Sequence, residues 1–529
     1  MKNKDYPLYK TPINACLSAM LENNAKSVAD KVAIRQRAGR KGMDSITYAQ
    51  LYDDVKRTAA YISENYGTGN HIAIIGENCY EWLLAFLGTI TSGNVAVPTD
   101  KELPAGEIKV LLAKADVSIA FISKTYADLV EDIEGLKTMT LKQLKSAEPA
   151  DAEGYELISP DMNSLAAIFF TSGTTGGSKG VMLSHNNITS EINQTSQLID
   201  PEGESTVAVL PFNHAFGLIV AVLMALNYQK TVFITKSLKT VQKDIEENKP
   251  EIIMLVPLFI ETFYKAIMSS VKAQGKEKKL MKGLKISNFL LKFGIDKRRE
   301  LFKDVLAPFG GNLRVIISGG APLDAFYVKR FREFGIEILN GYGTTECSPC
   351  VSVNRNKFRK DGSVGQLIPG MEARIAEDGE VELRGPVVMQ GYYGNPEATA
   401  EVLTEDGWYK TGDLGHVDED HFIFLTGRKK NLIILSNGEN VSPEEIESDF
   451  SIDPGVKEVL VYESGNKLVA EIYPEEEYMG NEAYFQELMM KVNKGRPLSK
   501  QIASVKLRDV EFIKNTTKKI VRNKNIPQK

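Results

Sequence analysis

The sequence predicts an α/β protein with a large N-terminal domain of layered sheets, a β-rich subdomain and a small C-terminal α+β domain. Strand-like apolar runs alternate with amphipathic helical stretches through most of residues 1–340, a pattern typical of layered and largely parallel sheets. From Gly370 onward, short alternating strands replace this pattern and indicate the β-rich part. The chain has 529 residues, too many for one ordinary hydrophobic core, so at least two domains are expected.

The elements of the large domain follow from the spacing of its apolar residues. Helices are expected at 49–64 and 323–334, where apolar residues recur at helical intervals. Strands are expected where short apolar runs are bounded by turn residues. These runs are 71–75, 166–170, 207–210, 231–234, 252–256 and 313–318.

The β-rich subdomain is expected to contain a hairpin. Residues 371–375 and 381–384 alternate in character on either side of Asp378-Gly379, a dipeptide that favours a tight turn. The sequence therefore predicts a strand–turn–strand unit after the large α/β part.

The last part of the chain is expected to open with a strand at 431–435 and a turn at Asn437-Gly438. A helix follows, with Ser442 as its N-cap and Pro443 in the first helical position. Glu445 is placed to complete a capping box with Ser442. These signals together predict a small α+β unit.

Composition excludes several classes of protein. Hydrophobic residues make up 43% and charged residues 25% of the chain, as in soluble globular proteins, and the net charge of −5 gives no sign of a nucleic-acid partner. Four cysteines, at positions 16, 79, 347 and 350, are too few for a disulfide framework and fit a reducing compartment. Cys347 and Cys350 form a CxxC without further nearby ligands, so a structural metal site is not expected there.

Neither a signal peptide nor a membrane span is expected. The first twenty residues lack the apolar core of a signal peptide. Residues 205–229 carry no charge apart from His214, but their uninterrupted apolar part is only 218–226, which suits a buried helix rather than a bilayer crossing. A cytoplasmic protein is therefore predicted.

The most informative stretch runs from Ile168 to Gly180, where an apolar strand leads into the loop TSGTTGGSKG. Glycines let backbone N–H groups approach an anion and hydroxyls add donors, so this loop suits a polyphosphate. A P-loop is excluded because Gly180, not Ser or Thr, follows Lys179. A plain surface loop rich in Gly, Ser and Thr is the other interpretation.

TSGTTGGSKG, at 171–180, resembles the signature of the adenylate-forming superfamily, which includes acyl-CoA synthetases, adenylation domains and beetle luciferases. Further similar stretches follow in the same order along nearly the whole chain. They are LPFNHAFG (210–217), SGGAPL (318–323), GYGTTE (341–346), YKTGD (409–413), GRKK (427–430) and TTKKI (516–520). Within the superfamily, ECSP (346–349), GYYGNP (391–396) and the lysine-rich insert at 272–303 look most like bacterial long-chain fatty acyl-CoA synthetases.

The resemblance implies which residues bind ATP and magnesium. The expected ATP-binding residues are Thr171, Ser172, Gly173, Thr174, Thr175, Lys179, Gly320, Ala321, Tyr342, Gly343, Thr345, Asp413, Arg428 and Lys519. The loop at 171–179 would fold over the β- and γ-phosphates, and Tyr342 would stack on adenine. Thr345 would act in catalysis by hydrogen bonding the α-phosphate. Glu346 would be the magnesium ligand, since Mg²⁺ prefers carboxylate and phosphate oxygens.

Three further roles are implied. Asp413, an acceptor-only carboxylate, would bind the ribose hydroxyls with Arg428 beside it. His214 would form a wall of the acyl pocket near the thiol entry, although a lone histidine is commonly a core residue. Lys519 would orient the carboxylate and the α-phosphate and offset their charge in the first step.

The register of this lysine is open between Lys518 and Lys519. The family usually has glycine or glutamine directly before the lysine, whereas this chain has Lys518, and Ile513 stands where a proline is common. Arg522 fits the expected frame and favours Lys519. Two solvated terminal lysines are the other interpretation.

The resemblance also implies a mobile C-terminal lid. Domains of 1–428 and 429–529 are expected, the second pivoting at Lys430 after the first step. The loop around Gly438 would then line the thiol tunnel, where a Cβ would obstruct the pantetheine arm.

The predicted function is ATP-dependent fatty acid–CoA ligation with ATP, Mg²⁺ and CoA. An acyl carrier protein is the alternative thiol acceptor. A non-catalytic nucleotide or lipid sensor on the same scaffold and a luciferase-like oxygenase are the remaining alternatives. The partners expected are therefore a fatty acid or other small carboxylic acid and one of the two thiols.

One charge pattern points to a further partner. Residues 272–304 contain eleven Lys and Arg against four acidic residues, with apolar residues interleaved. Such a segment either lies on an anionic membrane surface or forms a solvated helical pair whose lysines face water. Peripheral membrane contact is accordingly one of two interpretations of this segment.

Overall fold

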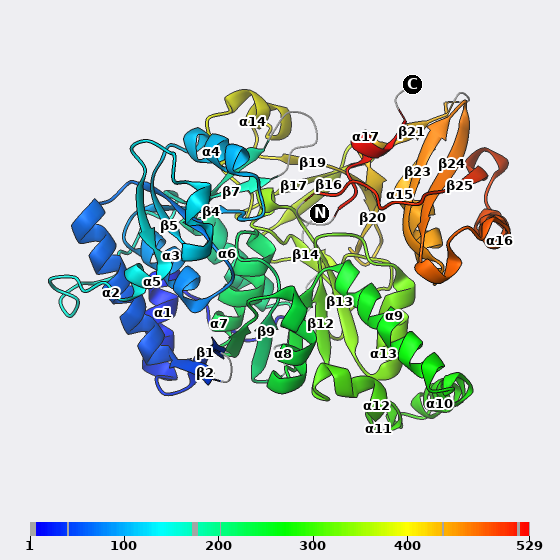
Figure 1. Ribbon diagram of the computed structural model, residues 1–529, viewed down its shortest axis with the longest axis horizontal. Coiled ribbons are helices and arrows are strands. Elements are labelled where there is room, and N and C mark those ends of the chain that lie inside the picture. Colours follow the sequence, from blue (N-terminus) through cyan, green and yellow to red (C-terminus); the bar gives the residue numbers. More distant parts are fainter. Residues whose placement is uncertain are drawn as a thin grey trace. The chain divides into compact units, whose positions relative to one another are not determined.

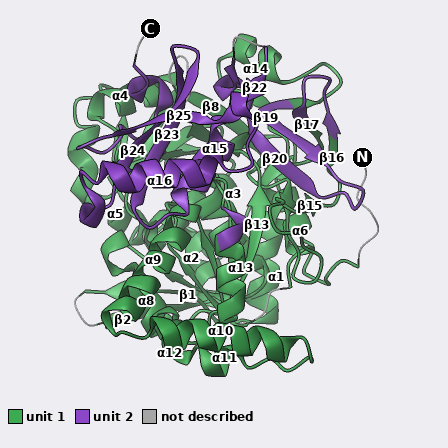
Figure 2. Cartoon of the chain, turned by 90° about the vertical axis from the view of Figure 1, so that its right-hand side faces the viewer, with its two compact units in different colours: residues 1–323, 327–373, 383–409 green, residues 324–326, 374–382, 410–529 purple. Residues whose placement is uncertain are grey.

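The computed structural model describes residues 7–39, 42–171, 178–200, 203–435, 438–515 and 519–527 (Figure 1). The chain forms two compact units (Figure 2). Unit 1 consists of residues 1–323, 327–373 and 383–409, and unit 2 of residues 324–326, 374–382 and 410–529. The expected boundary between residues 428 and 429 stays a prediction.

The larger sheet of unit 1 has nine strands in the order β15-β14-β13-β12-β11-β9-β10-β1-β2. The strands from β13 to β1 run parallel to one another, and antiparallel strands β14, β15 and β2 complete the two edges. Their bounds are β1 Val32–Ala38, β2 Gly42–Thr47, β9 Ser205–Ala208, β10 Thr231–Ile234, β11 Ile252–Leu255, β12 Val315–Ser318, β13 Glu337–Tyr342, β14 Ser352–Val353 and β15 Gln366–Leu367.

The second sheet of unit 1 has seven strands in the order β18-β8-β7-β4-β3-β5-β6. The strands from β7 to β6 are parallel, whereas β8 is antiparallel to both β7 and β18. Their bounds are β3 His71–Ile75, β4 Val95–Thr99, β5 Val117–Ile122, β6 Lys137–Thr140, β7 Leu165–Thr171, β8 Lys179–Ser184 and β18 Gly391–Tyr392. The predicted layered α/β architecture is confirmed.

Helices cover these sheets, and local signals explain several of them. Helix α2 begins with a reciprocal capping box between Thr47 and Gln50, and α9 has Pro257 in its first turn. The helices are α1 Leu17–Ser27, α2 Tyr48–Tyr66, α3 Tyr80–Thr91, α4 Ala105–Lys114, α5 Leu141–Lys145, α6 His185–Ser196, α7 Met224–Asn227, α8 Val241–Asn248, α9 Pro257–Ala273, α10 Glu277–Leu291, α11 Arg298–Leu301, α12 Lys303–Leu306, α13 Ala325–Phe334 and α14 Pro396–Val402.

The uncharged stretch that contains His214 forms a buried helix. It begins as the π-helix η2, Phe216–Leu223, and continues as α7. The expected buried helix is confirmed, with its start two residues earlier than the apolar run. Across the described ranges, no helix combines the length and the apolar character that a membrane crossing requires.

Most of the residues of a four-stranded sheet belong to unit 2. The order is β16-β17-β19-β20, and the predicted hairpin at Asp378-Gly379 joins β16 to β17. The strand bounds are β16 Glu372–Ile375, β17 Glu380–Arg384, β19 Tyr409–Val417 and β20 Ile423–Arg428.

The rest of unit 2 is an α+β layer with its own core. A three-stranded sheet, β23-β24-β25, packs with α15 and α16 around buried residues such as Phe450, Val461 and Phe485. The bounds are β21 Ile433–Ile434, β22 Asn440–Val441, α15 Pro443–Ser451, β23 Val456–Ser464, β24 Lys467–Pro474, α16 Glu482–Asn493, β25 Ile502–Leu507 and α17 Arg522–Asn525.

Two local predictions in unit 2 are wrong. The strand expected at 431–435 is only β21, because a 3₁₀ turn, Lys429–Asn431, precedes it. Pro443 begins α15 as predicted, but Ser442 makes no side-chain capping bond. Its hydroxyl instead donates to Glu444 Oε2 at 3.1 Å, so the expected capping box with Glu445 does not form.

Candidate active site

The parallel strands β11, β12 and β13 end together, and several expected ATP-binding residues follow these ends. Ser318, the last residue of β12, pairs with Leu255 of β11 and Asn340 of β13. Gly320 and Ala321 follow β12, and Tyr342 is the last residue of β13. Because ligands of open α/β sheets bind outside the carboxyl ends of the strands, this edge is the expected place for a nucleotide.

Two glycines shape this edge, Gly320 through its backbone conformation and Gly343 through lack of space for a side chain. Gly320 has a φ of +83°, in the left-handed region that glycine occupies without strain. A Cβ on Gly343 would lie 2.0 Å from the carbonyl oxygen of Pro349. The turns after β12 and β13 therefore follow paths that only glycine allows.

A carboxylate, a phenol and an ammonium group form a row next to this edge. Glu346 lies in the 3₁₀ turn η5, Thr345–Cys347, and its Oε1 accepts a hydrogen bond from the Tyr392 hydroxyl at 2.8 Å. The Nζ of Lys179 lies 4.7 Å from the centroid of the Tyr392 ring, within cation–π range. Tyr392 on β18 pairs with Val181 of β8, so two adjacent strands position Tyr392 and Lys179 next to each other.

Tyr392 stays protonated in this environment. Burial, followed by the charge of Glu346, raises the pKa of the Tyr392 phenol above its ordinary value. The phenol therefore remains a donor to Glu346 and fixes the orientation of that carboxylate. The sequence indicated Tyr392 only as part of GYYGNP and gave it no role.

Glu346 fits a divalent cation that is shared with a phosphate. Its side chain is partly exposed, and Tyr392 occupies only Oε1, which leaves Oε2 for another ligand. In the part of the chain that the structure describes, no group of three or more His, Cys, Asp or Glu side chains could hold a metal without other ligands. Magnesium here would therefore need phosphate oxygens as well, which is its common mode of binding.

Strands β7 and β8 pair as a hairpin, and the loop that we expect to bind phosphate lies between them in the sequence. Thr171 at the end of β7 and Lys179 at the start of β8 are paired partners. Ser172, Gly173, Thr174 and Thr175 lie outside the described residues. The hairpin therefore presents Lys179 at the base of the loop, on the strand next to Tyr392.

The remaining unit 1 candidates lie on two turns. Thr345 is half-buried in η5, one residue before Glu346. His214 is half-buried in the turn that leads into η2. A Cβ on Gly319 would lie 3.2 Å from the Phe216 ring, so the segment after His214 packs against the turn that follows β12.

A second tyrosine near Glu346 was also not predicted. Tyr409 is buried, and its oxygen accepts a long hydrogen bond of 3.5 Å from the Thr344 hydroxyl. Burial, followed by the charge of Glu346, raises the pKa of Tyr409 well above its ordinary value. Glu346 therefore lies within electrostatic range of two neutral phenols, Tyr392 and Tyr409.

In unit 2 the expected ribose-binding pair is formed. Asp413 on β19 and Arg428 on β20 are cross-strand partners. Arg428 Nε lies 2.7 Å from Asp413 Oδ1, and the Asp413 side chain is buried with 6% of its surface exposed. The backbone N–H of Asp413 donates to Thr411 Oγ1 at 3.0 Å, which further fixes the aspartate.

Lys519 lies within electrostatic range of this pair. Loss of hydration, followed by the charge of Arg428, lowers its pKa, and Asp413 acts in the opposite direction. Asn515 holds the loop by two bonds: its Oδ1 accepts from the Lys519 N–H at 2.9 Å, and its own N–H donates to the Lys519 carbonyl at 3.0 Å. Lys518 lies outside the described residues.

An ion pair holds the base of the Lys519 loop. Arg522 donates to both oxygens of Glu447, at 2.8 and 3.0 Å, and to the carbonyl of Val461 at 2.6 Å. Glu447 Oε1 also accepts from the Val461 N–H at 2.7 Å. The sequence indicated Arg522 only as a register marker and gave no sign of Glu447.

The hinge and thiol-tunnel candidates are also in unit 2. Lys430 lies in the 3₁₀ turn after β20, and loss of hydration followed by repulsion from Arg428 lowers its pKa. Gly438 has a φ of +82°, and a Cβ there would meet no atom within 4 Å. Backbone conformation, rather than lack of space, therefore favours glycine at this position.

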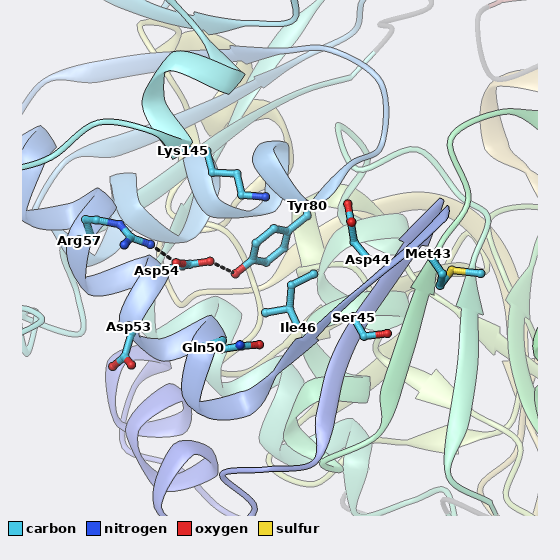
Figure 3. Close-up of a pocket in the computed structure, with 10 residues that line it drawn as sticks. All are labelled: Met43, Asp44, Ser45, Ile46, Gln50, Asp53, Asp54, Arg57, Tyr80 and Lys145. Atoms are coloured by element: carbon cyan, nitrogen blue, oxygen red, sulfur yellow. Dashed lines mark hydrogen bonds and ion pairs between the residues drawn. The ribbon is translucent and has the colours of Figure 1, made fainter. Parts of the chain in front are cut away.

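A separate pocket of about 550 Å³ lies in unit 1 between β2, α2, α3 and α5 (Figure 3). Figure 3 shows Arg57 and Tyr80 both directed at Asp54, and the Tyr80 hydroxyl donates to Asp54 Oδ2 at 2.8 Å. Lys145 Nζ lies 5.0 Å from the centroid of the Tyr80 ring. No residue expected to bind ATP lines this pocket, and we assign it no part in the activity.

Known proteins share this fold and these motifs. A model of the AMP-binding enzyme family matches residues 21–393. Long-chain-fatty-acid–CoA ligase FadD15 of Mycobacterium tuberculosis is 30% identical over 482 residues, in a match that covers 84% of this chain and 79% of that protein. Human long-chain-fatty-acid–CoA ligase 1 is 28% identical over 477 residues, covering 79% of this chain and 68% of that protein.

Solved structures share the fold of this chain. ATP-bound MatB from Rhodopseudomonas palustris superposes with a TM-score of 0.77 at 26% identity, covering 97% of this chain and 98% of that chain. The anthranilate CoA ligase AuaEII in complex with anthranoyl-AMP has a TM-score of 0.81 at 20% identity, with 97% of each chain covered, and supports the fold alone.

The fold and these similarities define an adenylate-forming enzyme. The chain belongs to the family of AMP-binding enzymes, since the family match covers well over half of its length. The resemblance to long-chain acyl-CoA synthetases and the acid–thiol ligase class are confirmed. The roles of individual residues stay predictions.

Proposed function

We propose that the protein is an ATP-dependent fatty acid–CoA ligase that works in two steps. A fatty acid and ATP give acyl-AMP and pyrophosphate, and the acyl group then passes to the thiol of CoA with release of AMP. The names of the two ligases above support a long-chain fatty acid as the substrate. The observation that carries the proposal is the row of Lys179, Tyr392 and Glu346 beside the β7–β8 hairpin.

In the first step a carboxylate oxygen attacks the α-phosphorus of ATP. The bond from that phosphorus to the bridging oxygen breaks, and the electron pair leaves with pyrophosphate. Because both reactants are anions, positioned cations and hydrogen-bond donors lower the barrier. Lys179 contacts the β- and γ-phosphates, Thr345 donates to the α-phosphate, and Lys519 contacts both the α-phosphate and the carboxylate.

The nucleoside is held by shape and by one carboxylate. Tyr342 stacks on adenine, and Gly320 and Ala321 leave room for the ring. Asp413 accepts hydrogen bonds from the ribose hydroxyls while Arg428 holds it in place, as their 2.7 Å ion pair supports.

Glu346 and phosphate oxygens would hold magnesium, with Tyr392 fixing the carboxylate through Oε1. The bound ion offsets the negative charge of the phosphates. The partial exposure of Glu346 and its free Oε2 support this assignment.

The second step uses the same acyl-AMP. The thiol sulfur attacks the acyl carbon, the thiol proton is lost, and the bond to the AMP phosphate oxygen breaks. We assign His214 to the wall of the acyl pocket, Lys430 to the hinge, and Gly438 to the thiol tunnel. The left-handed φ of Gly438 supports a backbone path that other residues would strain.

ATP–pyrophosphate exchange with a panel of carboxylic acids tests the first step without assuming an acceptor. Exchange should be greatest with long-chain fatty acids and absent without an acid. Addition of CoA or of an acyl carrier protein then distinguishes the acceptors, and acyl-CoA is the expected product. Exchange with no acid in the panel would reject the proposed function, and acylation of the carrier protein alone would replace CoA as the acceptor.

A further inference from the structure

Apolar side chains are exposed on α10 and on the segment that follows it. This region lies beside α11 and α12 in both views of unit 1 (Figures 1 and 2). The exposed fractions are 47% for Met281, 43% for Ile286, 60% for Phe289, 67% for Phe293, 47% for Ile295 and 46% for Leu301. The rings of Phe289 and Phe293 contact each other edge to face at 5.1 Å. An exposed pair of aromatic rings, with further exposed apolar residues on the same segment, is typical of an interaction site.

The helix is firmly packed on its other side. Leu280, Leu284 and Ser287 are buried, and the two leucines share a cluster with Phe302 and Phe334. Lys278, Lys282, Lys285 and Phe289 recur at spacings of four, three and four, so they share the opposite face. We call Lys278, Lys282, Lys285, Phe289 and Phe293 the lysine–aromatic face.

The positively charged side chains of residues 272–304 include some with partners within the protein and some that are exposed to solvent. Arg298 pairs with Asp296 at 2.8 Å, Arg299 donates to backbone carbonyls, and Lys297 pairs with Glu300 at 2.7 Å. The lysines of the lysine–aromatic face are exposed, and the described residues offer them no ion pair. The segment 272–304 keeps an excess of seven positive charges in a chain of net charge −5.

We propose that the lysine–aromatic face docks on an anionic lipid surface. Its two phenylalanine rings bury themselves at the level of the headgroups, and its lysines meet the lipid phosphates. A second copy of the chain is a poorer occupant, because a two-fold contact of this face with itself would bring lysines against lysines. This proposal goes beyond the ligase activity and holds for any substrate of the enzyme.

Co-sedimentation with vesicles tests the proposal on the full-length protein. Vesicles of phosphatidylcholine, with and without phosphatidylglycerol, are used at low and high salt. The test variant changes Lys278, Lys279, Lys282 and Lys285 to Glu. The matched control reverses four exposed lysines elsewhere in unit 1, Lys114, Lys124, Lys142 and Lys239.

The wild type should bind the anionic vesicles, and binding should fall at high salt because the lysines contribute electrostatically. The test variant should bind at least about tenfold more weakly, while the control variant, with the same net charge, keeps most of the binding. Phe289→Ser with Phe293→Ser should weaken binding at both salt concentrations, because burial of the rings is not screened.

Three results would overturn the proposal. One is equal binding by the wild type and the test variant. Another is equal loss in the test and control variants, which would show a general charge effect. The third is binding of the wild type to neutral vesicles only. Pyrophosphate exchange in solution should be unchanged in every variant, which separates loss of docking from loss of folding.

Discussion

The candidate residues of the two units differ in what fixes them. In unit 1, strand ends and turns restricted to glycine hold Tyr342, Gly343 and Glu346 in a backbone framework. In unit 2, ion pairs between side chains hold the candidate residues. Asp413 pairs with Arg428, and Arg522 pairs with Glu447 at the base of the Lys519 loop. The comparison teaches that backbone conformation fixes much of the candidate site in unit 1, whereas side-chain ion pairs fix it in unit 2.

The electrostatics of the two units differ in the same way. Around Glu346 the phenols of Tyr392 and Tyr409 are neutral, because burial and the carboxylate raise the pKa of each. Around Lys519 two further cations, Arg428 and Lys430, lie within electrostatic range, and the charge of Asp413 opposes them. Unit 2 therefore concentrates positive charge that an anionic substrate offsets, and four predictions test this division.

Lys519→Ala should have the largest effect. Removing a group that acts mainly in the transition state should slow acyl-AMP formation by about a thousandfold or more. Thioester formation from preformed acyl-AMP and CoA should continue at a substantial rate, because we assign the charge of Lys519 to the first step. Pyrophosphate exchange and a single-turnover thioesterification assay measure the two steps separately.

Lys518→Ala is the matched control for this lysine. It should leave both steps largely unchanged. An inactive Lys518→Ala beside an active Lys519→Ala would reverse the assignment. Equal losses in both steps for Lys519→Ala would reject the division of labour.

Glu346→Gln should have the next largest effect. The amide keeps the shape of the side chain and removes the charge that we assign to magnesium, so the first step should slow by about a hundredfold. The magnesium concentration for half-maximal exchange should rise. Tyr392→Phe leaves the charge but removes the bond to Oε1, and it should have a smaller effect in the same direction. Unchanged magnesium dependence in Glu346→Gln would make Glu346 a structural residue.

The sequence predicted the sheet framework well where strands are short, continuous apolar runs. The expected 71–75 and 231–234 coincide with β3 and β10, because strands buried in parallel sheets carry an unbroken hydrophobic signal. The prediction failed at 431–435, because a 3₁₀ turn that begins at Lys429 extends through Asn431. Local residue propensities did not indicate a 3₁₀ turn in place of the start of the strand.

The candidate site was predictable only in part. The Asp413–Arg428 contact was expected from the resemblance alone, because the fourteen intervening positions do not reveal the cross-strand register of β19 and β20. Tyr392 lies 46 positions after Glu346, and no local pattern connects the two. The resemblance supplied the motif residues, whereas the residues that orient them became visible only when distant strands were placed side by side.

Arg522→Ala should have a moderate effect, because it acts through Lys519. Loss of the bidentate pair leaves Glu447, whose side chain is only 16% exposed, without its partner and loosens the base of the loop. Acyl-AMP formation should slow by about tenfold, with little change in thioesterification. Thermal unfolding measures the accompanying loss of stability, and Arg522→Lys should restore part of both properties. A loss of stability with the two steps equally affected would limit Arg522 to a structural role.

Arg428→Gln should produce the smallest effect, a shift in pH dependence rather than a large loss at saturating ATP. In the role that we propose for Lys519, acyl-AMP formation uses its protonated ammonium group, so the rate should fall as pH rises through the pKa of that group. Loss of hydration and the charge of Arg428 lower this pKa. The rate should therefore begin to fall at a lower pH than it would with an ordinary lysine; we call this fall the alkaline limb of the pH profile. Removing the guanidinium charge should raise the pKa of Lys519, so the fall in rate should move to higher pH. Single-turnover rates across the alkaline range measure the shift, and Lys491→Gln removes an equal charge on α16 as a control that should leave the limb in place. If the pH range in which the rate falls is unchanged in Arg428→Gln, or moves lower, the titrating group is not Lys519.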